Sequence, residues 1–131
     1  MDKISRNKSN ELIMKCIYAN LVQNIFNKKI IENIYERKMN DIDDFSKKTI
    51  SIAIKNKDKI IKILEKKLIN WKWERISTIS QAILIMSYTH FKYTENIDKS
   101  VVIDIAIKLS KKFSDDKEYK FINAVLDKIL L

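Results

Sequence analysis

The segment DKSVVIDIAIKLSKKFSDDKEYKFINAVLDKIL, residues 98–130, decides the fold because helical repeats of apolar residues flank one short acidic turn. The spacing before the turn predicts a helix over residues 101–113. Asp115 and Glu118 stand three apart, as in a capping box, which predicts that a last helix begins near Asp116. Apolar residues of that helix follow the i, i+3, i+4, i+7, i+8 pattern, namely Ile122, Val125, Leu126, Ile129 and Leu130.

Similar spacing runs through the rest of the 131-residue chain, which has no Gly and no Pro. Hairpin turns and phosphate-binding loops usually rely on Gly, so we expect an all-α single domain of about seven helices. Residues 70–77 interrupt the pattern, and we expect two small packed bundles, over about residues 1–70 and 71–131. The other predicted helices span residues 9–27, 29–39, 44–56, 58–69 and 78–93, of which the third and fourth could be one kinked helix.

The formal net charge of +9 favours a polyanion as partner, either nucleic acid or an anionic surface. The alternative is a basic surface without a specific partner, because an AT-rich genome would also enrich Lys. Cys16 is the only cysteine, which excludes an internal disulfide and suits a reducing cytosol. We find neither a stretch long enough to cross a bilayer nor a secretory leader, and we expect a cytoplasmic protein.

Several segments together resemble the NusB family of bacterial transcription antitermination factors. In that family a helix reading roughly INEAVELAKKF leads through an acidic turn to KFVNGVLDK, which here corresponds to residues 103–113 and 120–128. Residues 70–77, NWKWERIS, resemble the family's segment with Trp and Arg before a long C-terminal helix. Residues 5–18, SRNKSNELIMKCIY, resemble an arginine-rich segment leading into a helix that ends QALY.

The resemblance implies the NusB-like fold, with about seven helices in two packed bundles. It also implies an RNA-binding antitermination factor that binds boxA-like single-stranded RNA together with NusE, a small-subunit ribosomal protein. Such a factor would join the RNA polymerase antitermination complex and support ribosomal RNA transcription. No catalytic residue, metal or other cofactor is expected, and whether the chain is a monomer or a homodimer is left open.

Two basic regions are candidates for the RNA-binding surface, one at the first helix and one around the acidic turn. Cations that follow phosphates, beside an aromatic ring that can stack on a base, suit single-stranded RNA. Phe113 could supply that ring, or it could simply cap the core. The predicted residues, of which Tyr18 comes from the resemblance, are Lys3, Arg6, Lys8, Lys15, Tyr18, Lys111, Lys112, Phe113, Lys117 and Lys120.

By resemblance, NusE would contact the helix over residues 78–93, through Ser77, Ser80, Gln81 and Leu84. The family's ERAILRL reads SQAILIM here, so the acidic residue is missing at Ser80 and the interface is left open. Ser114 stands where the family usually has Gly, as does Ala124, which leaves the geometry of the Ser114 turn open.

Residues suited to catalysis or metal binding are few. His90 falls on an inward face, which predicts a buried, hydrogen-bonded histidine, and Cys16 should act as a small apolar residue. The acidic residues Asp41, Asp43 and Asp44 lack an EF-hand pattern and indicate a helix cap instead.

Two alternative functions remain in view. One is a helical protein-interaction module with a nonspecific basic surface. The other is the NusB-like module of ribosomal RNA methyltransferases, which is disfavoured because a chain ending at Leu131 leaves no room for a methyl-donor domain.

Overall fold

The computed structural model describes residues 3–94, 97–115 and 117–131, and every regular element in these residues is helical. This confirms the predicted all-α fold with seven helices. Two short 3₁₀ turns, Met39–Asp41 and Trp73–Arg75, interrupt the chain. The α-helices are α1 (Arg6–Gln23), α2 (Lys28–Tyr35), α3 (Asp44–Lys55), α4 (Lys57–Lys67), α5 (Thr78–Tyr93), α6 (Lys99–Phe113) and α7 (Glu118–Ile129).

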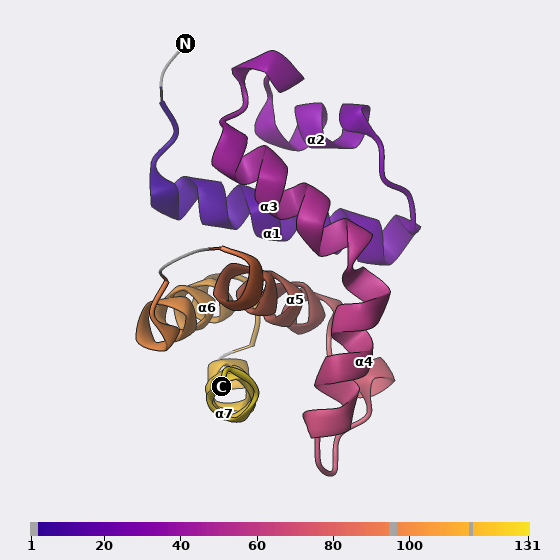
Figure 1. Cartoon of the computed structure of the whole chain (residues 1–131), viewed down its shortest axis with the longest axis vertical. Coiled ribbons are helices and arrows are strands. Elements are labelled where there is room, and N and C mark those ends of the chain that lie inside the picture. The colour runs from indigo at the N-terminus through magenta and orange to yellow at the C-terminus, as the bar shows by residue number, and fades with distance from the viewer. Residues whose placement is uncertain (1–2, 95–96, 116) are drawn as a thin grey trace.

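The helices form two groups, with α1, α2 and α3 in the upper part of Figure 1 and α5, α6 and α7 below them. Helix α4 descends from α3 beside the second group and packs against α5 and α7. The division near residue 70 stays a prediction, because one continuous core joins both groups.

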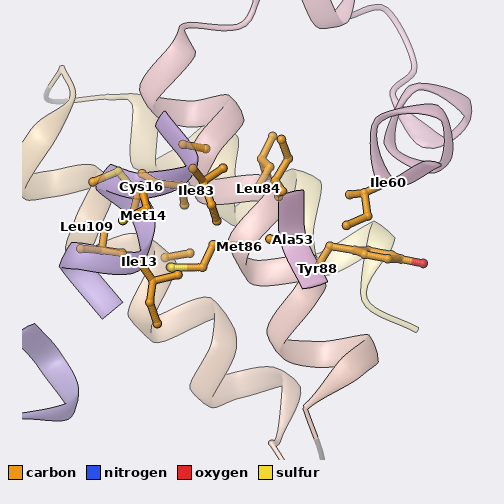
Figure 2. Close-up of a cluster of buried hydrophobic side chains, with 14 of the residues drawn as sticks. Ile13, Met14, Cys16, Ala53, Ile60, Ile83, Leu84, Met86, Tyr88 and Leu109 are labelled. Carbon is orange, nitrogen blue, oxygen red and sulfur yellow. The ribbon is translucent and has the colours of Figure 1, made fainter. Parts of the chain in front are cut away.

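Helix α5 lies at the centre of that core, and every residue from Ala82 to Tyr88 is buried. It packs against α1, α3, α4, α6 and α7, which explains why apolar residues occur on all its sides. Figure 2 shows α5 residues Ile83, Leu84 and Met86 among side chains that include Ile13 of α1 and Leu109 of α6. The core therefore fixes α1 and α6 against a common neighbour.

Capping residues set the ends of α1, which the sequence pattern misplaced. The helix begins at Arg6 and not at residue 9, because the Ser5 hydroxyl accepts from the Lys8 backbone N–H at 3.2 Å. It ends at Gln23, before the predicted residue 27, where Asn24 adopts a left-handed conformation with φ 52°.

Helix α2 is shorter than the predicted 29–39. The Asn27 side chain caps its start by accepting from the Ile30 N–H at 3.0 Å. Its end comes at Tyr35 because Glu36 is left-handed, with φ 55°, and Met39 already belongs to a 3₁₀ turn.

Helices α3 and α4 are separate and meet at Asn56, where the backbone leaves helical geometry (φ −103°, ψ 10°). The carboxylate of Asp43 caps α3, accepting from the Ser46 N–H at 2.9 Å and from its hydroxyl at 2.8 Å. The prediction that this acidic cluster contains a helix cap is confirmed for Asp43.

In the C-terminal group, α5 matches its predicted bounds and α6 starts two residues early, at Lys99. The predicted capping box at α7 is wrong. Lys117 occupies the N-cap position without a side-chain cap, and the Glu118 carboxylate is engaged elsewhere, by hydroxyls of α5 and its cap. Asp116 lies outside the described residues.

At Ser114, the backbone that follows α6 needs no glycine. Ser114 has extended backbone, with φ −124° and ψ −179°, so no left-handed residue is required there. Its hydroxyl donates to the Ser110 carbonyl at 2.7 Å, and its N–H donates to the same carbonyl at 2.9 Å. These bonds satisfy the end of α6 in place of a glycine cap.

Among the described residues, no helix combines the length and apolar character needed to cross a bilayer.

Candidate nucleic-acid interface

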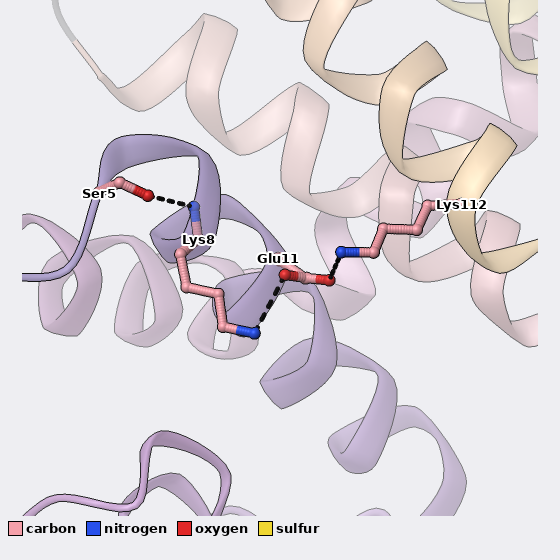
Figure 3. A network of polar contacts seen from close by, with 4 residues as sticks. All are labelled: Ser5, Lys8, Glu11 and Lys112. Carbon is pink, nitrogen blue, oxygen red and sulfur yellow. Dashed lines mark hydrogen bonds and ion pairs between the residues drawn. The ribbon is translucent and has the colours of Figure 1, made fainter.

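Two basic segments that lie far apart in the sequence meet where α1 packs beside α6. The Glu11 carboxylate of α1 binds the Lys112 ammonium of α6 at 2.7 Å and that of Lys8, one turn earlier on α1, at 3.3 Å. Figure 3 shows these contacts, which continue to Ser5, the cap of α1. The carboxylate therefore fixes two predicted RNA-binding lysines relative to each other.

Glu11 is buried, whereas its two lysine partners keep 53% and 62% of their side-chain surface exposed. The pKa of Glu11 lies below its ordinary value, chiefly because Lys112 hydrogen-bonds the ionised form, and this outweighs the cost of burial. The carboxylate is therefore charged at neutral pH. More than half of the side-chain surface of Lys8 and of Lys112 is still exposed to solvent.

A cavity of about 360 Å³ lies at this junction and combines cations, amides and an apolar floor. Asn10 is buried there, and its side-chain oxygen has no hydrogen-bond partner among the described residues. Ammonium groups suit phosphates, and amides suit the edges of unpaired bases. We call this cavity the α1–α6 groove, and it is lined by Ser5, Asn7, Lys8, Asn10, Glu11, Ile105, Lys108, Leu109 and Lys112.

The ring of Phe113, at the end of α6, is half-buried and packs against the core. The Lys15 and Lys112 ammonium groups lie 5.3 and 5.4 Å from its centroid, within the range of cation–π attraction. The packing of Phe113 against the core is therefore observed, whereas its stacking on a base stays a prediction. The ring completes the core on one side, and a base that stacked on it would meet two cations.

Lys117 and Lys120 are exposed at the start of α7, beyond the turn. Across that turn the Lys111 ammonium lies 4.6 Å from the ring centroid of Tyr119. Tyr119 is not among the predicted residues, although its place in the sequence between Lys117 and Lys120 was a usable signal. The turn thus carries a second pair of an aromatic ring and a cation beside that of Phe113.

Of the ten predicted RNA-binding residues, only Lys8 and Lys112 line the α1–α6 groove, and three of the others lie clearly apart from it. Lys3 and Arg6 line a different hollow, of about 730 Å³, beside the connection between α2 and α3. The Arg6 guanidinium lies 3.7 Å from the ring centroid of Phe45, at the start of α3. Tyr18 is exposed roughly 15 Å further along α1 than Lys8. The predicted set is therefore divided between at least two faces.

Of the residues predicted to contact a protein partner, Ser80 and Leu84 have no exposed surface. As folded, only Ser77 and Gln81 can meet a partner directly. The Glu118 carboxylate of α7 accepts from the hydroxyls of both Ser77 and Ser80, each at 2.8 Å. A neighbouring helix thus brings a carboxylate to the position where the resemblance led us to expect an acidic residue.

His90 is buried as predicted, but neither ring nitrogen has a hydrogen-bond partner among the described residues, which corrects the second part of that prediction. Its ring stacks on Phe45 with 5.8 Å between centroids. Burial, with a contribution from the Arg6 charge, lowers the pKa of His90 to about 4. The ring is therefore neutral and packed as an aromatic side chain.

Cys16 is buried, and burial raises the pKa of its thiol to about 12, so the thiol is unreactive at neutral pH. Within residues 3–94, 97–115 and 117–131, no group of three or more His, Cys, Asp or Glu side chains is placed to hold a metal ion.

Comparison with known proteins gives a consistent result. The model of the NusB family matches residues 7–131. Transcription antitermination protein NusB of Clostridium botulinum (strain Alaska E43 / Type E3) is 37% identical, over 98% of this chain and 96% of the relative. The Bacillus subtilis (strain 168) protein of the same name is 29% identical, over 96% of this chain and 95% of the relative.

Solved structures share the fold at lower identity. T. maritima NusB superposes with a TM-score of 0.81 at 22% identity, covering 98% of this chain and 92% of that one. A crystal structure of antitermination factors NusB and NusE in complex with dsRNA matches with a TM-score of 0.82 at 20% identity, covering 95% of each chain.

Proposed function

The chain belongs to the NusB family of transcription antitermination proteins, and we propose that it binds boxA-like single-stranded RNA jointly with NusE. In this role it would act in the cytoplasm, within an RNA polymerase antitermination complex on ribosomal RNA genes. It would work by assembly and not by catalysis.

The observation that carries the proposal is the junction of α1 and α6. Lys8 and Lys112 come from two helices and are oriented by one buried carboxylate, while most of their surface stays in solvent. Fixed cations beside Asn amides and the Phe113 ring can bind phosphates and at the same time discriminate between unpaired bases. A basic surface produced by composition alone would not require such positioning.

Joint binding with NusE is supported by a relative whose crystal structure contains both proteins with RNA. In this chain we propose contacts through Ser77 and Gln81, with the charge of Glu118 close to them. That carboxylate would take the place of the acidic residue missing at Ser80. Because Glu118 also starts α7, the partner site would lie next to the lysines of the acidic turn.

The alternative is a helical protein-interaction module whose basic surface binds any polyanion. A boxA-like RNA and a scrambled RNA of the same length, each measured with and without NusE at near-physiological salt, separate the two. We expect boxA-like RNA with NusE to bind most tightly. Equal affinities in all four cases would contradict the proposal, because charge alone gives binding that depends on salt and not on sequence.

A matched pair of charge reversals tests the site itself. We expect Lys117→Glu with Lys120→Glu to weaken RNA binding and to flatten its salt dependence, since these lysines flank the turn. Lys59→Glu with Lys62→Glu places the same change, at the same three-residue spacing, on the exposed face of α4. Lys57 is unsuitable as a control because its ammonium donates to Asn20 of α1 at 2.8 Å. Equal losses in both double variants would mean that net charge, and not the turn, determines binding.

A further inference from the structure

The two tryptophans of the segment between α4 and α5 have opposite environments. Trp73 is buried, whereas Trp71 is 53% exposed and lies beside Ile69, which is 69% exposed. The Trp71 ring rests on Phe121 of α7, with 4.7 Å between centroids and an interplanar angle of 54°. Asn70 holds this bend with a left-handed backbone, φ 69°. A large aromatic side chain is therefore half exposed to solvent at a defined turn.

Cations border this ring on two sides. One hollow, of about 100 Å³, has Lys67 on one wall and Lys128 of α7 on another. A second, of about 420 Å³, has Lys72 and Arg75 beside Trp71. None of these four cations forms an ion pair with another of the described residues. They are available to an anionic ligand.

Helix α7 connects this ring to the acidic turn. One stripe of its surface follows the spacing i, i+3, i+4, i+7, i+11 and contains three lysines, one aromatic residue and no acidic residue. Phe121 and Ala124 of the stripe, with its last lysine, line the hollow next to Trp71. The stripe spans roughly 16 Å along α7 and consists of Lys117, Lys120, Phe121, Ala124 and Lys128.

We propose that Trp71 and this stripe form a second contact site for single-stranded RNA. Phosphates follow Lys117, Lys120 and Lys128, and an unpaired base stacks on the exposed face of Trp71. RNA is favoured over a protein partner because protein interfaces are depleted in lysine, whereas a row of cations ending at an aromatic ring suits a polyanion with stacking bases. The inference rests on the proposed RNA-binding function. It extends the path of the bound RNA along α7, away from the α1–α6 groove.

The test compares a short boxA-like RNA with two longer forms, extended by about six unpaired pyrimidines at the 5′ or at the 3′ end. We expect one extension to tighten binding to the unaltered protein. We expect Trp71→Ala to weaken binding of that extended RNA by roughly 5- to 100-fold, to the level of the short form, since stacking on an aromatic ring has that magnitude. Trp71→Phe should restore part of the affinity.

Phe26→Ala is the matched control, because Phe26 is 50% exposed but lies in the connection between α1 and α2. In a Trp73→Phe background, Trp71 becomes the only tryptophan, and its fluorescence should be quenched by the extended RNA but not by the short one.

Three outcomes would overturn the inference. They are equal affinity of the short and extended RNAs, an equal effect of Trp71→Ala and Phe26→Ala, and a Trp71→Ala variant that loses NusE binding but keeps all RNA binding. The last would assign the ring to a protein partner. A different result would separate the two proposals. If boxA-like RNA bound no better than scrambled RNA, but Trp71→Ala still weakened binding of the extended RNA, the proposed function would be contradicted and the RNA contact at Trp71 would be supported.

Discussion

Replacing Glu11 with Gln should lower the free energy of unfolding of the protein. The same change should raise its affinity for RNA at low salt. The change keeps the shape of the side chain but removes the charge that holds Lys8 and Lys112. A hydrogen bond to a charged group contributes about 1.5–3 kcal/mol when well shielded. Both lysines are more than half exposed, so solvent screening reduces the expected loss to about 1–2 kcal/mol for the pair together.

For a chain of this length a loss of 1 kcal/mol corresponds to roughly 4 °C in Tm, so Glu11→Gln should melt about 4–8 °C below the parent at pH 7. The sign of the pH dependence follows from the lowered pKa of Glu11. The stabilisation is present above the ordinary value of 4.5 and is lost as the pH falls through the folded pKa. Thermal melts near pH 3 should therefore show a smaller difference between variant and parent.

In RNA binding, Glu11→Gln removes a negative charge from the α1–α6 groove, and we expect scrambled RNA to bind a few-fold more tightly at low ionic strength. The preference for boxA-like RNA should fall, because the two lysines no longer have fixed positions. Glu65→Gln, on the exposed face of α4, is the matched control. An unchanged Tm, or equal effects of the two substitutions on RNA binding, would refute this account of Glu11.

Three further predictions concern the interior and the start of α7. Glu118→Gln weakens the hydrogen-bond acceptor shared by Ser77 and Ser80, so it should lower Tm by a few degrees. It should also reduce NusE binding more than Ser80→Ala does. An equal reduction of NusE binding by the two variants would argue against a direct role of the carboxylate. His90 has a folded pKa of about 4, below the ordinary 6.5, so the unfolded chain binds more protons and stability should fall by about 3 kcal/mol as the pH drops from 6.5 to 4. His90→Phe should remove that part of the pH profile in denaturant titrations, and a profile identical to that of the parent would contradict the assignment. Cys16 should react with a thiol reagent only at the rate of unfolding, and a fast reaction of the native protein would contradict its burial.

The sequence predicts helices well where local and tertiary preferences agree. Helix α5 has its predicted bounds because Ser77 caps its start and an unbroken apolar pattern matches a helix buried on several sides. The start of α1 was readable from the Ser5 hydroxyl, although the apolar pattern alone points to a later residue. The end of α2 was not readable, because Glu36 adopts the left-handed geometry that Gly or Asn usually marks.

The candidate site was predicted less completely, because its organising contacts join distant segments. Glu11 follows Lys8 by three residues, which a search for helical charge pairs would find, but its shorter contact is with Lys112, a hundred positions away. Glu118 has the spacing of a capping box, but its carboxylate accepts hydrogen bonds from the hydroxyls of Ser77 and Ser80, at the start of α5, and does not cap α7. The local rule is therefore incomplete at Glu11 and fails at Glu118, because in both cases the carboxylate also has a partner from a distant segment.

A buried carboxylate at the centre of a basic groove has a physical reason. Without Glu11 the ammonium groups of Lys8 and Lys112 would lose the carboxylate that both contact, and neither side chain would be held at the junction of α1 and α6. With Glu11 present, one carboxylate contacts both ammonium groups, and the pair of lysines keeps a net positive charge at the surface. Both lysines are thereby positioned before any ligand arrives, so binding does not have to supply the free energy of ordering these two side chains. Lys8 and Lys112 look independent in the sequence, but for this reason they are held as one pair whose geometry depends on an acidic residue.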